Sequence, residues 1–238
     1  MSATLAIDTS SSLSSIALRR EDGAIFEYEG GDPNSHNETL IGHVLELLSQ
    51  AGVRPSQLGV LIDGAGPGSF TGLRISLSFL KGLSLGLGIP LHCLSSLAAI
   101  AASAAASEAG IVISLADARR DEIFCGAFDR RHGYAPICAE MIIPIGEFSK
   151  FAEEICRNAT GTTVEIVTCG VNSTQLGTAL KTTPASHFAR GLLNLLDKDS
   201  TGSSFSLPEL CAAAPHYMRA VSAKTIEERE RRASRAAS

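Results

Sequence analysis

The chain has no tryptophan, and aromatic residues make up only 5% of its 238 residues. Proteins that bind single-stranded nucleic acids stack the bases on aromatic side chains, so this scarcity argues against such a platform. Basic residues do not dominate either, because 20 lysines and arginines stand against 25 aspartates and glutamates. The formal net charge of −5 therefore lacks the basic footprint of a domain that binds nucleic acid strongly by itself.

The chain also lacks the cysteine spacing of a metal site. Its six cysteines never occur as Cys-x-x-Cys, so we expect buried free thiols in a reducing cytosol. The longest apolar region, residues 73–91, is interrupted by Arg74, Lys81, serines and glycines, which is too polar for a membrane span. The N-terminus has no basic segment before its short apolar run, which Asp8 ends, and so does not resemble a signal peptide. These absences predict a cytoplasmic protein without a membrane segment.

The hydrophobic pattern predicts the same order of elements twice. Each series begins with a meander of strands and continues with alternating helices and strands. In the first series we expect strands at 4–8, 14–19, 24–28, 58–63 and 89–94, and helices at 38–51, 73–86 and 96–109. In the second we expect strands at 111–115, 122–128, 135–142 and 164–169, and helices at 144–157 and 186–196. The prediction is an α/β protein of two similar folds in tandem, an N-terminal lobe of residues 1–108 and a C-terminal lobe of residues 109–238 that ends in a charged tail.

The most distinctive segment is Gly-Pro-Gly-Ser-Phe-Thr-Gly-Leu-Arg, between a predicted strand and a predicted helix. Glycine tolerates a positive φ and close backbone approach, and proline fixes its own φ, so Gly66, Pro67, Gly68 and Gly72 impose an unusual backbone path. Thr71 is the expected N-cap of the helix. Arg74 would then lie in the first helical turn, where the helix dipole disfavours a cation, so we expect it to have a carboxylate partner or a function.

Two interpretations of this glycine-rich loop remain open, and we favour the first. It is a tight structural turn, or it is a cradle of backbone N–H groups that binds an anion at a helix N-terminus. It is not a Walker loop, because Gly68 and Gly72 are too close together and no lysine follows. The Gly-x-Ser-x-Gly run at residues 82–86 lies inside a predicted helix and not at the strand-to-helix turn that a nucleophile elbow needs, so the sequence does not support nucleophilic hydrolysis.

Several blocks, taken in order along the chain, resemble the bacterial TsaB (YeaZ) family. They are Leu5–Ser10, Gly66–Arg74, Lys81–Leu83, Gly88–Pro90, Ser95–Leu97, Asp117–Arg120 and Pro215–Arg219. The resemblance implies an actin/Hsp70/sugar-kinase-like fold of two RNase-H-like lobes. It also implies a role in making N6-threonylcarbamoyladenosine at position 37 of tRNAs that read ANN codons. There the protein is a non-catalytic partner of a paralogous transferase subunit (TsaD type), joined by an ATPase subunit (TsaE type), and tRNA is reached only through the complex.

Catalytic relatives of this fold hold ATP phosphates between two acidic, glycine-bearing hairpins. The corresponding hairpins here carry Asp8 and Ser10, and Asp117, without the expected glycines, and the adenosine-binding glycine pair is reduced to Gly170. The resemblance therefore implies a degenerate nucleotide cleft, with no cofactor required by this chain and ATP and Mg²⁺ confined to the assembled complex. The alternative for Asp8 is that it caps a hairpin turn.

Two alternative functions would each depend on a few residues. An active ATP-dependent phosphotransferase or ATPase of the sugar-kinase class would use Asp8 and Asp117. A metallo-glycopeptidase would need ligands, yet the positions of the transferase paralogue's His-x-x-x-His pair align with Ser96 and Ile100, and neither suits a metal. His36 and His43 lie seven residues apart and could share a helix face, but we expect no metal there.

Partner-binding residues are expected on the two helices of the first lobe. In the family these helices form a bundle with the partner or with a second copy of the same chain, which implies a homodimer when the chain is alone. Small residues at positions 78, 82 and 86 permit close helix approach. We expect the contact to lie at or beside Leu40, Val44, Leu47, Leu77 and Lys81. The alternative is that these residues are ordinary core.

Overall fold

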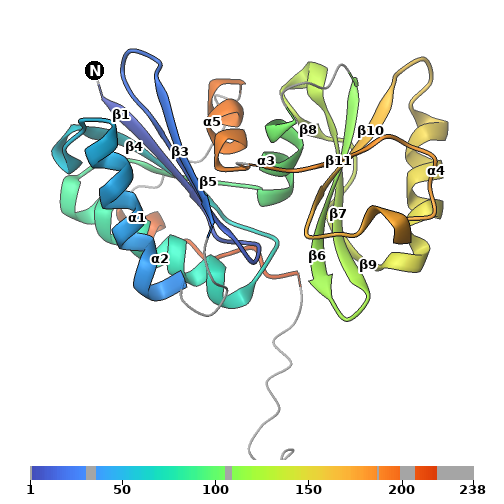
Figure 1. Ribbon diagram of the computed structural model, residues 1–238, viewed down its shortest axis with the longest axis horizontal. Coiled ribbons are helices and arrows are strands. Elements are labelled where there is room, and N and C mark those ends of the chain that lie inside the picture. The colour runs from blue at the N-terminus through green and yellow to red at the C-terminus, as the bar shows by residue number, and fades with distance from the viewer. Residues whose placement is uncertain (1, 31–35, 105–108, 187, 199–206, 219–238) are drawn as a thin grey trace, which may run out of the picture.

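The computed structural model describes residues 2–30, 36–104, 109–186, 188–198 and 207–218 (Figure 1). Its first sheet has five strands in the order β3-β2-β1-β4-β5. The first three strands form an antiparallel meander, and β4 and β5 continue parallel to β1. The strands are β1 Ala3–Asp8, β2 Ser14–Arg19, β3 Ile25–Gly30, β4 Leu58–Gly64 and β5 Leu91–Leu94.

The second sheet repeats this plan, with the order β11-β10-β6-β7-β8 and with β9 also paired to β7. Its strands are β6 Ile111–Arg119, β7 Glu122–Asp129, β8 Ala135–Pro136, β9 Met141–Pro144, β10 Val164–Cys169 and β11 Thr182–Pro184. Again an antiparallel meander is followed by strands parallel to the first one. The predicted fold class, an α/β protein of two lobes with one duplicated topology, is therefore confirmed.

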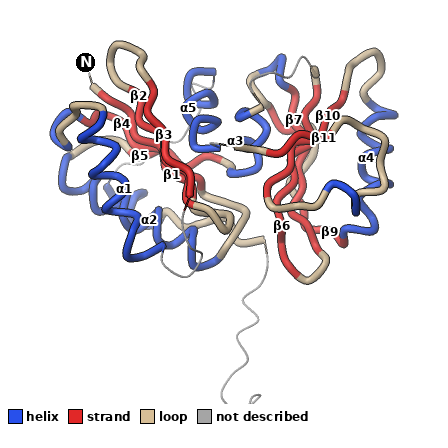
Figure 2. The backbone as a smooth tube through the Cα atoms, viewed as in Figure 1, coloured by secondary structure: helices blue, strands red, loops and turns tan. Residues whose placement is uncertain are grey.

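The helices form three layers around the two sheets (Figures 1 and 2). The outer face of the first sheet is covered by α1 and α2, the outer face of the second by α4, and α3 and α5 lie between the sheets. The helices are α1 His36–Gln50, α2 Phe70–Leu87, α3 Ser96–Ser103, α4 Phe148–Asn158, α5 Phe188–Lys198 and α6 Leu207–Ala212. None of these helices has the length and apolar character needed to span a bilayer.

Two helices cross between the lobes. The chain passes from the first sheet to the second between β5 and β6. However, α3 packs on β6 and β7 of the second sheet, and α5 packs on β1 and β2 of the first. A single central core of small and apolar side chains therefore joins the lobes, including Ala6, Ala17, Ala99, Val112 and Leu192.

The C-terminal part of the described chain returns to the first lobe. Leu210 of α6 is buried in the core beneath α1 and α2. The Lys81 ammonium group on α2 donates a 2.6 Å hydrogen bond to the carbonyl of Ala213. The predicted C-terminal lobe thus contributes its last described segment to the N-terminal one, and the charged tail beyond residue 218 lies outside the described residues.

The sequence prediction differed from the structure at a few elements. The strand expected at 135–142 is two short strands, β8 and β9, that pair with different parts of β7. The helix expected to reach residue 109 ends, as described, at Ser103. The short strand β11 and helix α6 were not predicted, since each has few residues and no clear hydrophobic period.

Candidate functional site

The glycine-rich loop leads into α2, and a serine rather than a threonine caps this helix. Ser69 is the N-cap, and its hydroxyl accepts a 3.3 Å hydrogen bond from the N–H of Gly72. The expected cap, Thr71, is wrong, because it already lies inside the helix. Arg74 consequently lies two residues further from the cap than expected, in the second turn, where the helix dipole disfavours a cation less.

The loop packs backbone to backbone against the turn between β1 and β2. The N–H of Ser69 donates to the carbonyl of Ser10 at 2.7 Å, and the hydroxyl of Thr9 donates to the carbonyl of Gly72 at 2.7 Å. A Cβ atom at Gly68 would lie 2.4 Å from the Ser10 oxygen, and one at Gly72 would lie 1.9 Å from the Thr9 oxygen. Only glycine fits at these two positions.

The start of the loop is fixed in the same way. Gly66, which has a φ of 104° and precedes a cis peptide bond to Pro67, exchanges two hydrogen bonds with Ser96. Its N–H donates to the Ser96 hydroxyl at 3.1 Å, and its carbonyl accepts from the Ser96 N–H at 2.8 Å. Three N–H groups of the loop, those of Gly66, Ser69 and Gly72, donate hydrogen bonds within the chain. This favours the structural turn over the anion cradle.

A cleft of about 580 Å³ lies between the lobes. It is lined by the β1–β2 turn, the start of α2, the β6–β7 turn, the end of β10 and the C-terminal segment. Ser10, Asp117 and Gly170, which we predicted as nucleotide contacts, are brought together there. Asp8, the fourth predicted contact, is not among the residues that line the cleft.

Asp8 is fully buried behind the cleft. One carboxylate oxygen accepts the N–H of Ser10 at 2.7 Å, and the other lies over Gly64, where a Cβ atom would approach it to 2.0 Å. Burial raises the pKa of Asp8, and hydrogen bonding to Ser10 and Ser96 lowers it in part. This is the turn-capping role that we weighed against a Mg²⁺ role.

The second hairpin is equally closed on itself. An oxygen of Asp117 accepts the N–H of Arg119 at 2.7 Å, and Arg119, Arg120 and Asp121 all have positive φ angles between 58° and 64°. Nucleotide phosphates are held by free backbone N–H groups and by a carboxylate that reaches the metal. Here the N–H groups of Ser10 and Arg119 are occupied and Asp8 does not line the cleft, so these three residues do not form the phosphate cradle that we considered from the sequence.

Asp63, which we did not identify from the sequence, is the second fully buried carboxylate. It lies on β4 directly opposite Cys93 of β5, on the face covered by α2. Burial raises its pKa to about 8 and the charge of Asp8 adds to this, whereas Ser76 and Lys81 lower it. Burial and the Asp63 charge also raise the pKa of Cys93 to about 12. The only signal in the sequence is an acid inside an apolar strand.

The residues considered for a metal have other roles. The Ser96 side chain is fully buried against the glycine-rich loop, and Ile100 belongs to the central core. The Nε2 atom of His43 lies 2.9 Å from the hydroxyl of Tyr28, and the two rings stack at 3.9 Å. The side chain of His36 lies outside the described residues. Among the side chains that are described, no three histidines, cysteines or acids come together in a metal-binding group.

The outer surface of α1 and α2 is apolar, but the predicted contact residues do not form it. Leu40, Val44, Leu47 and Leu77 are at most 5% exposed and pack in the core of this chain, so their place beside a partner contact stays a prediction. The fifth, Lys81, points to the C-terminal segment. The exposed apolar side chains are instead Ile41 (52%), Leu45 (55%), Phe70 (37%) and Leu85 (50%).

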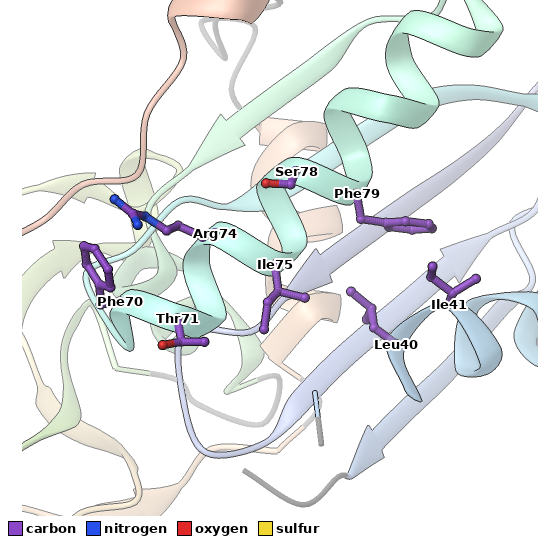
Figure 3. Close-up of a pocket in the computed structure, with 8 residues that line it drawn as sticks. All are labelled: Leu40, Ile41, Phe70, Thr71, Arg74, Ile75, Ser78 and Phe79. Atoms are coloured by element: carbon purple, nitrogen blue, oxygen red, sulfur yellow. The ribbon is translucent and has the colours of Figure 1, made fainter. Parts of the chain in front are cut away.

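A groove of about 590 Å³ runs between α1 and α2 (Figure 3). We call it the α1–α2 groove, and it is lined by Leu40, Ile41, Phe70, Thr71, Arg74, Ile75, Ser78 and Phe79. In Figure 3 the aliphatic side chains of α1 and α2 point toward one another, whereas Phe70 and Arg74 lie together at one end of the groove. The Arg74 guanidinium carbon lies 3.9 Å from the Phe70 ring centre, and its Nε donates to the Tyr217 hydroxyl at 2.9 Å.

Comparison with known proteins agrees with this architecture. A family model described as TsaD, tRNA N6-adenosine threonylcarbamoyltransferase, matches residues 32–227. The tRNA threonylcarbamoyladenosine biosynthesis protein TsaB of Bacillus subtilis is 34% identical over 140 residues, 59% of either chain. That of Escherichia coli is 33% identical over 127 residues, 53% of this chain and 54% of its own length. The matches thus span little more than half the length of these curated relatives.

Solved structures extend the likeness to nearly the whole chain. A Pseudomonas aeruginosa protein described as similar to the peptidase YeaZ superposes with a TM-score of 0.76 at 26% identity, over 92% of this chain and all of that one. YeaZ from the same organism gives a TM-score of 0.71 at 26% identity, over 91% of this chain and all of its own. The chain therefore belongs to the TsaD family, and within it to the TsaB/YeaZ proteins.

Proposed function

We propose that this chain is a non-catalytic partner subunit in the biosynthesis of N6-threonylcarbamoyladenosine at position 37 of tRNAs that read ANN codons. The names of its relatives support the pathway. Its direct partner would be the paralogous transferase subunit (TsaD type), with an ATPase subunit (TsaE type) joining them in the cytoplasm. Transfer of the threonylcarbamoyl group would take place on the transferase, and tRNA would be bound by the complex.

The observation that carries the partner role is the apolar outer surface of α1 and α2. Ile41, Leu45 and Leu85 are each at least half exposed, which is unfavourable for a chain that stays alone in water. The glycines on these helices also support a partner surface. A Cβ atom at Gly42, Gly82 or Gly86 would meet no described atom within 4 Å, so nothing in the part of the chain that the structure describes requires glycine there.

Helical glycine costs roughly 1 kcal/mol relative to alanine, and close approach of a helix from outside would explain this cost. The same surface suits a second copy of the chain, and we therefore infer a homodimer when the transferase is absent. The non-catalytic part of the proposal is supported by the interlobe cleft, where the N–H groups of Ser10, Ser69 and Arg119 are used for internal hydrogen bonds.

Co-expression with the TsaD-type subunit of the same organism tests the proposal. Size-exclusion chromatography with light scattering should give a stable one-to-one complex. Leu45→Glu should abolish the complex and leave a folded monomer, because a charge would be placed in an apolar contact. Ile137→Glu is the matched control, since Ile137 is 41% exposed on the other lobe.

Two results would contradict the proposal. One is the absence of any complex between the wild-type proteins. The other is ATP turnover by the isolated chain that Asp117→Asn removes, because this would show an active phosphotransferase or ATPase that uses the interlobe cleft.

A further inference from the structure

Arg74 differs from the other residues of the α1–α2 groove. Of the eight described residues that line the groove, it alone is charged. The groove is otherwise formed by aliphatic and aromatic side chains with two small hydroxyl groups. A partner that fills such a groove with apolar side chains would remove water from its surroundings, including from the guanidinium group at its end.

The Arg74 side chain is held in place from two sides. Its guanidinium lies over the Phe70 ring at 3.9 Å and near the Tyr217 ring at 5.8 Å, and the two rings themselves are 4.9 Å apart. The Nε atom donates to the Tyr217 hydroxyl at 2.9 Å. An arginine fixed by stacking loses less rotamer freedom when it binds than a freely moving one. The position of its charge is therefore set before a partner arrives.

The two terminal NH₂ groups of Arg74 have no acceptor in the part of the chain that the structure describes. No aspartate or glutamate of that part forms an ion pair with Arg74. The aromatic rings contact the planar face of the guanidinium and accept no hydrogen bond from the terminal N–H groups at its edge. Burying a cation without an acceptor is costly, whereas a carboxylate satisfies the two-pronged edge of a guanidinium with two parallel hydrogen bonds. The N-terminal half of α2 adds a weak positive potential that also favours an anion there.

We infer that Arg74 recognises a carboxylate of the partner and so sets the position of the partner helix in the α1–α2 groove. The occupant is an amphipathic helix of the TsaD-type subunit, with apolar side chains between α1 and α2 and one aspartate or glutamate at the Phe70–Arg74 end. This inference rests on the proposed function and adds to it the residue that determines orientation and specificity. Loss of the charge then affects affinity, its salt dependence and the choice of partner.

Isothermal titration calorimetry with the TsaD-type subunit of the same organism tests this inference. Arg74→Met should weaken binding by at least about tenfold and reduce its dependence on salt, because one desolvated charge pair is lost. Arg74→Lys should bind with intermediate affinity, since lysine keeps the charge but not the fork. Arg54→Met is the control, because Arg54 is an exposed arginine of the same lobe outside the groove, and its affinity should match the wild type.

The carboxylate is then found by a double-mutant cycle. Aspartates and glutamates on the partner are replaced by alanine one at a time, and one of them should cost as much as Arg74→Met with no further loss when both are combined. Thermal unfolding of each variant shows that the fold is kept, and Arg74→Lys provides the comparison if Arg74→Met unfolds.

The outcomes separate the inference from the proposed function. Wild-type affinity for folded Arg74→Met, together with loss of binding for Leu45→Glu, would leave the partner surface intact and overturn the role of Arg74. Unchanged subunit affinity with weaker tRNA binding by the assembled complex would also overturn it, because Arg74 would then contact phosphate. No binding by the wild type would overturn the proposed function and the inference together.

Discussion

Gly72→Ala and Gly82→Ala should change the stability of this chain in opposite directions, although both glycines lie in α2. A Cβ atom at Gly82 would meet no atom within 4 Å, so alanine adds helix propensity without a clash. The intrinsic gain is about 1 kcal/mol, which corresponds to a rise in Tm of about 2–4 °C for a chain of this size. Gly82 is exposed in the monomer, so this value applies to the chain kept monomeric by Leu45→Glu and not to the homodimer or to a complex.

At Gly72 the same methyl group would lie 1.9 Å from the carbonyl oxygen of Thr9 and 3.0 Å from its carbonyl carbon. Both atoms belong to the backbone at the end of β1, which is paired on both sides and fully buried. The clash can be relieved only if the glycine-rich loop moves away, which breaks the hydrogen bond between the Thr9 hydroxyl and the Gly72 carbonyl. We expect a loss of about 3 kcal/mol or more.

Urea unfolding followed by circular dichroism measures both effects on this monomeric chain. Ser78→Ala, an exposed substitution on the same helix, is the control and should change the stability by less than about 0.5 kcal/mol. If Gly72→Ala were as stable as Gly82→Ala, the close contact between the loop and the β1–β2 turn would be wrong. If Gly82→Ala lowered the stability, the outer face of α2 would not be open in the monomer.

Three further predictions concern stability and reactivity. The pKa of Asp63 is raised from 3.8 to about 8, so the folded chain keeps a proton there that the unfolded chain loses, and stability falls as pH rises through that window; Asp63→Asn should raise the Tm at pH 7.5 but not near pH 4, and an equal effect at both would exclude this titration. Ser95 caps α3 by accepting the N–H of Ala98 at 3.0 Å, so Ser95→Ala should cost about 1 kcal/mol in urea unfolding, whereas no loss would show that the cap is dispensable. Cys125 is fully buried and its pKa is raised to about 12, so it should react with a thiol reagent at pH 8 only as fast as the chain unfolds, and rapid labelling of Cys125 in the folded chain would contradict its burial.

The fold was largely predictable because its information is local. Alternating apolar residues and turn residues mark the two meanders, and helical spacing marks α1, so the duplicated order could be recognised before any contact was known. The start of α2 was not predictable at the same level. Ser69 and Thr71 are both suitable caps, and the choice depends on the loop being tied to Ser10, which lies far away in the sequence.

The cleft residues were predictable only where their place follows from the order of the strands. Ser10, Asp117 and Gly170 do meet at one cleft, because they follow strands whose ends come together when the lobes pack. The choice between the two roles that we considered for Asp8 was not predictable, since its burial depends on Gly64 of the neighbouring strand. The exposed side chains of the α1–α2 surface were not predicted for a related reason. The strongest helical period of α1 marks its inward face, so Leu40 and Val44 were chosen, whereas the exposed Ile41 and Leu45 follow each of them by one residue.

The glycine-rich loop explains how the outside of the first lobe can carry the proposed partner surface without a ligand in the interlobe cleft. A loop that binds phosphate must keep its N–H groups free for the ligand. The conformation of the surrounding residues is then fixed only when the ligand is bound. Here Gly66 and Ser69 donate to Ser96 and Ser10, and the carbonyl of Ala65 accepts the N–H of His216 at 2.7 Å. These bonds fix the start of α2 without any ligand. Because Phe70 and Arg74 follow within the next turn and a half, the same bonds also fix the end of the α1–α2 groove. We therefore expect a rigid partner surface to need a loop whose N–H groups are used by hydrogen bonds within the chain.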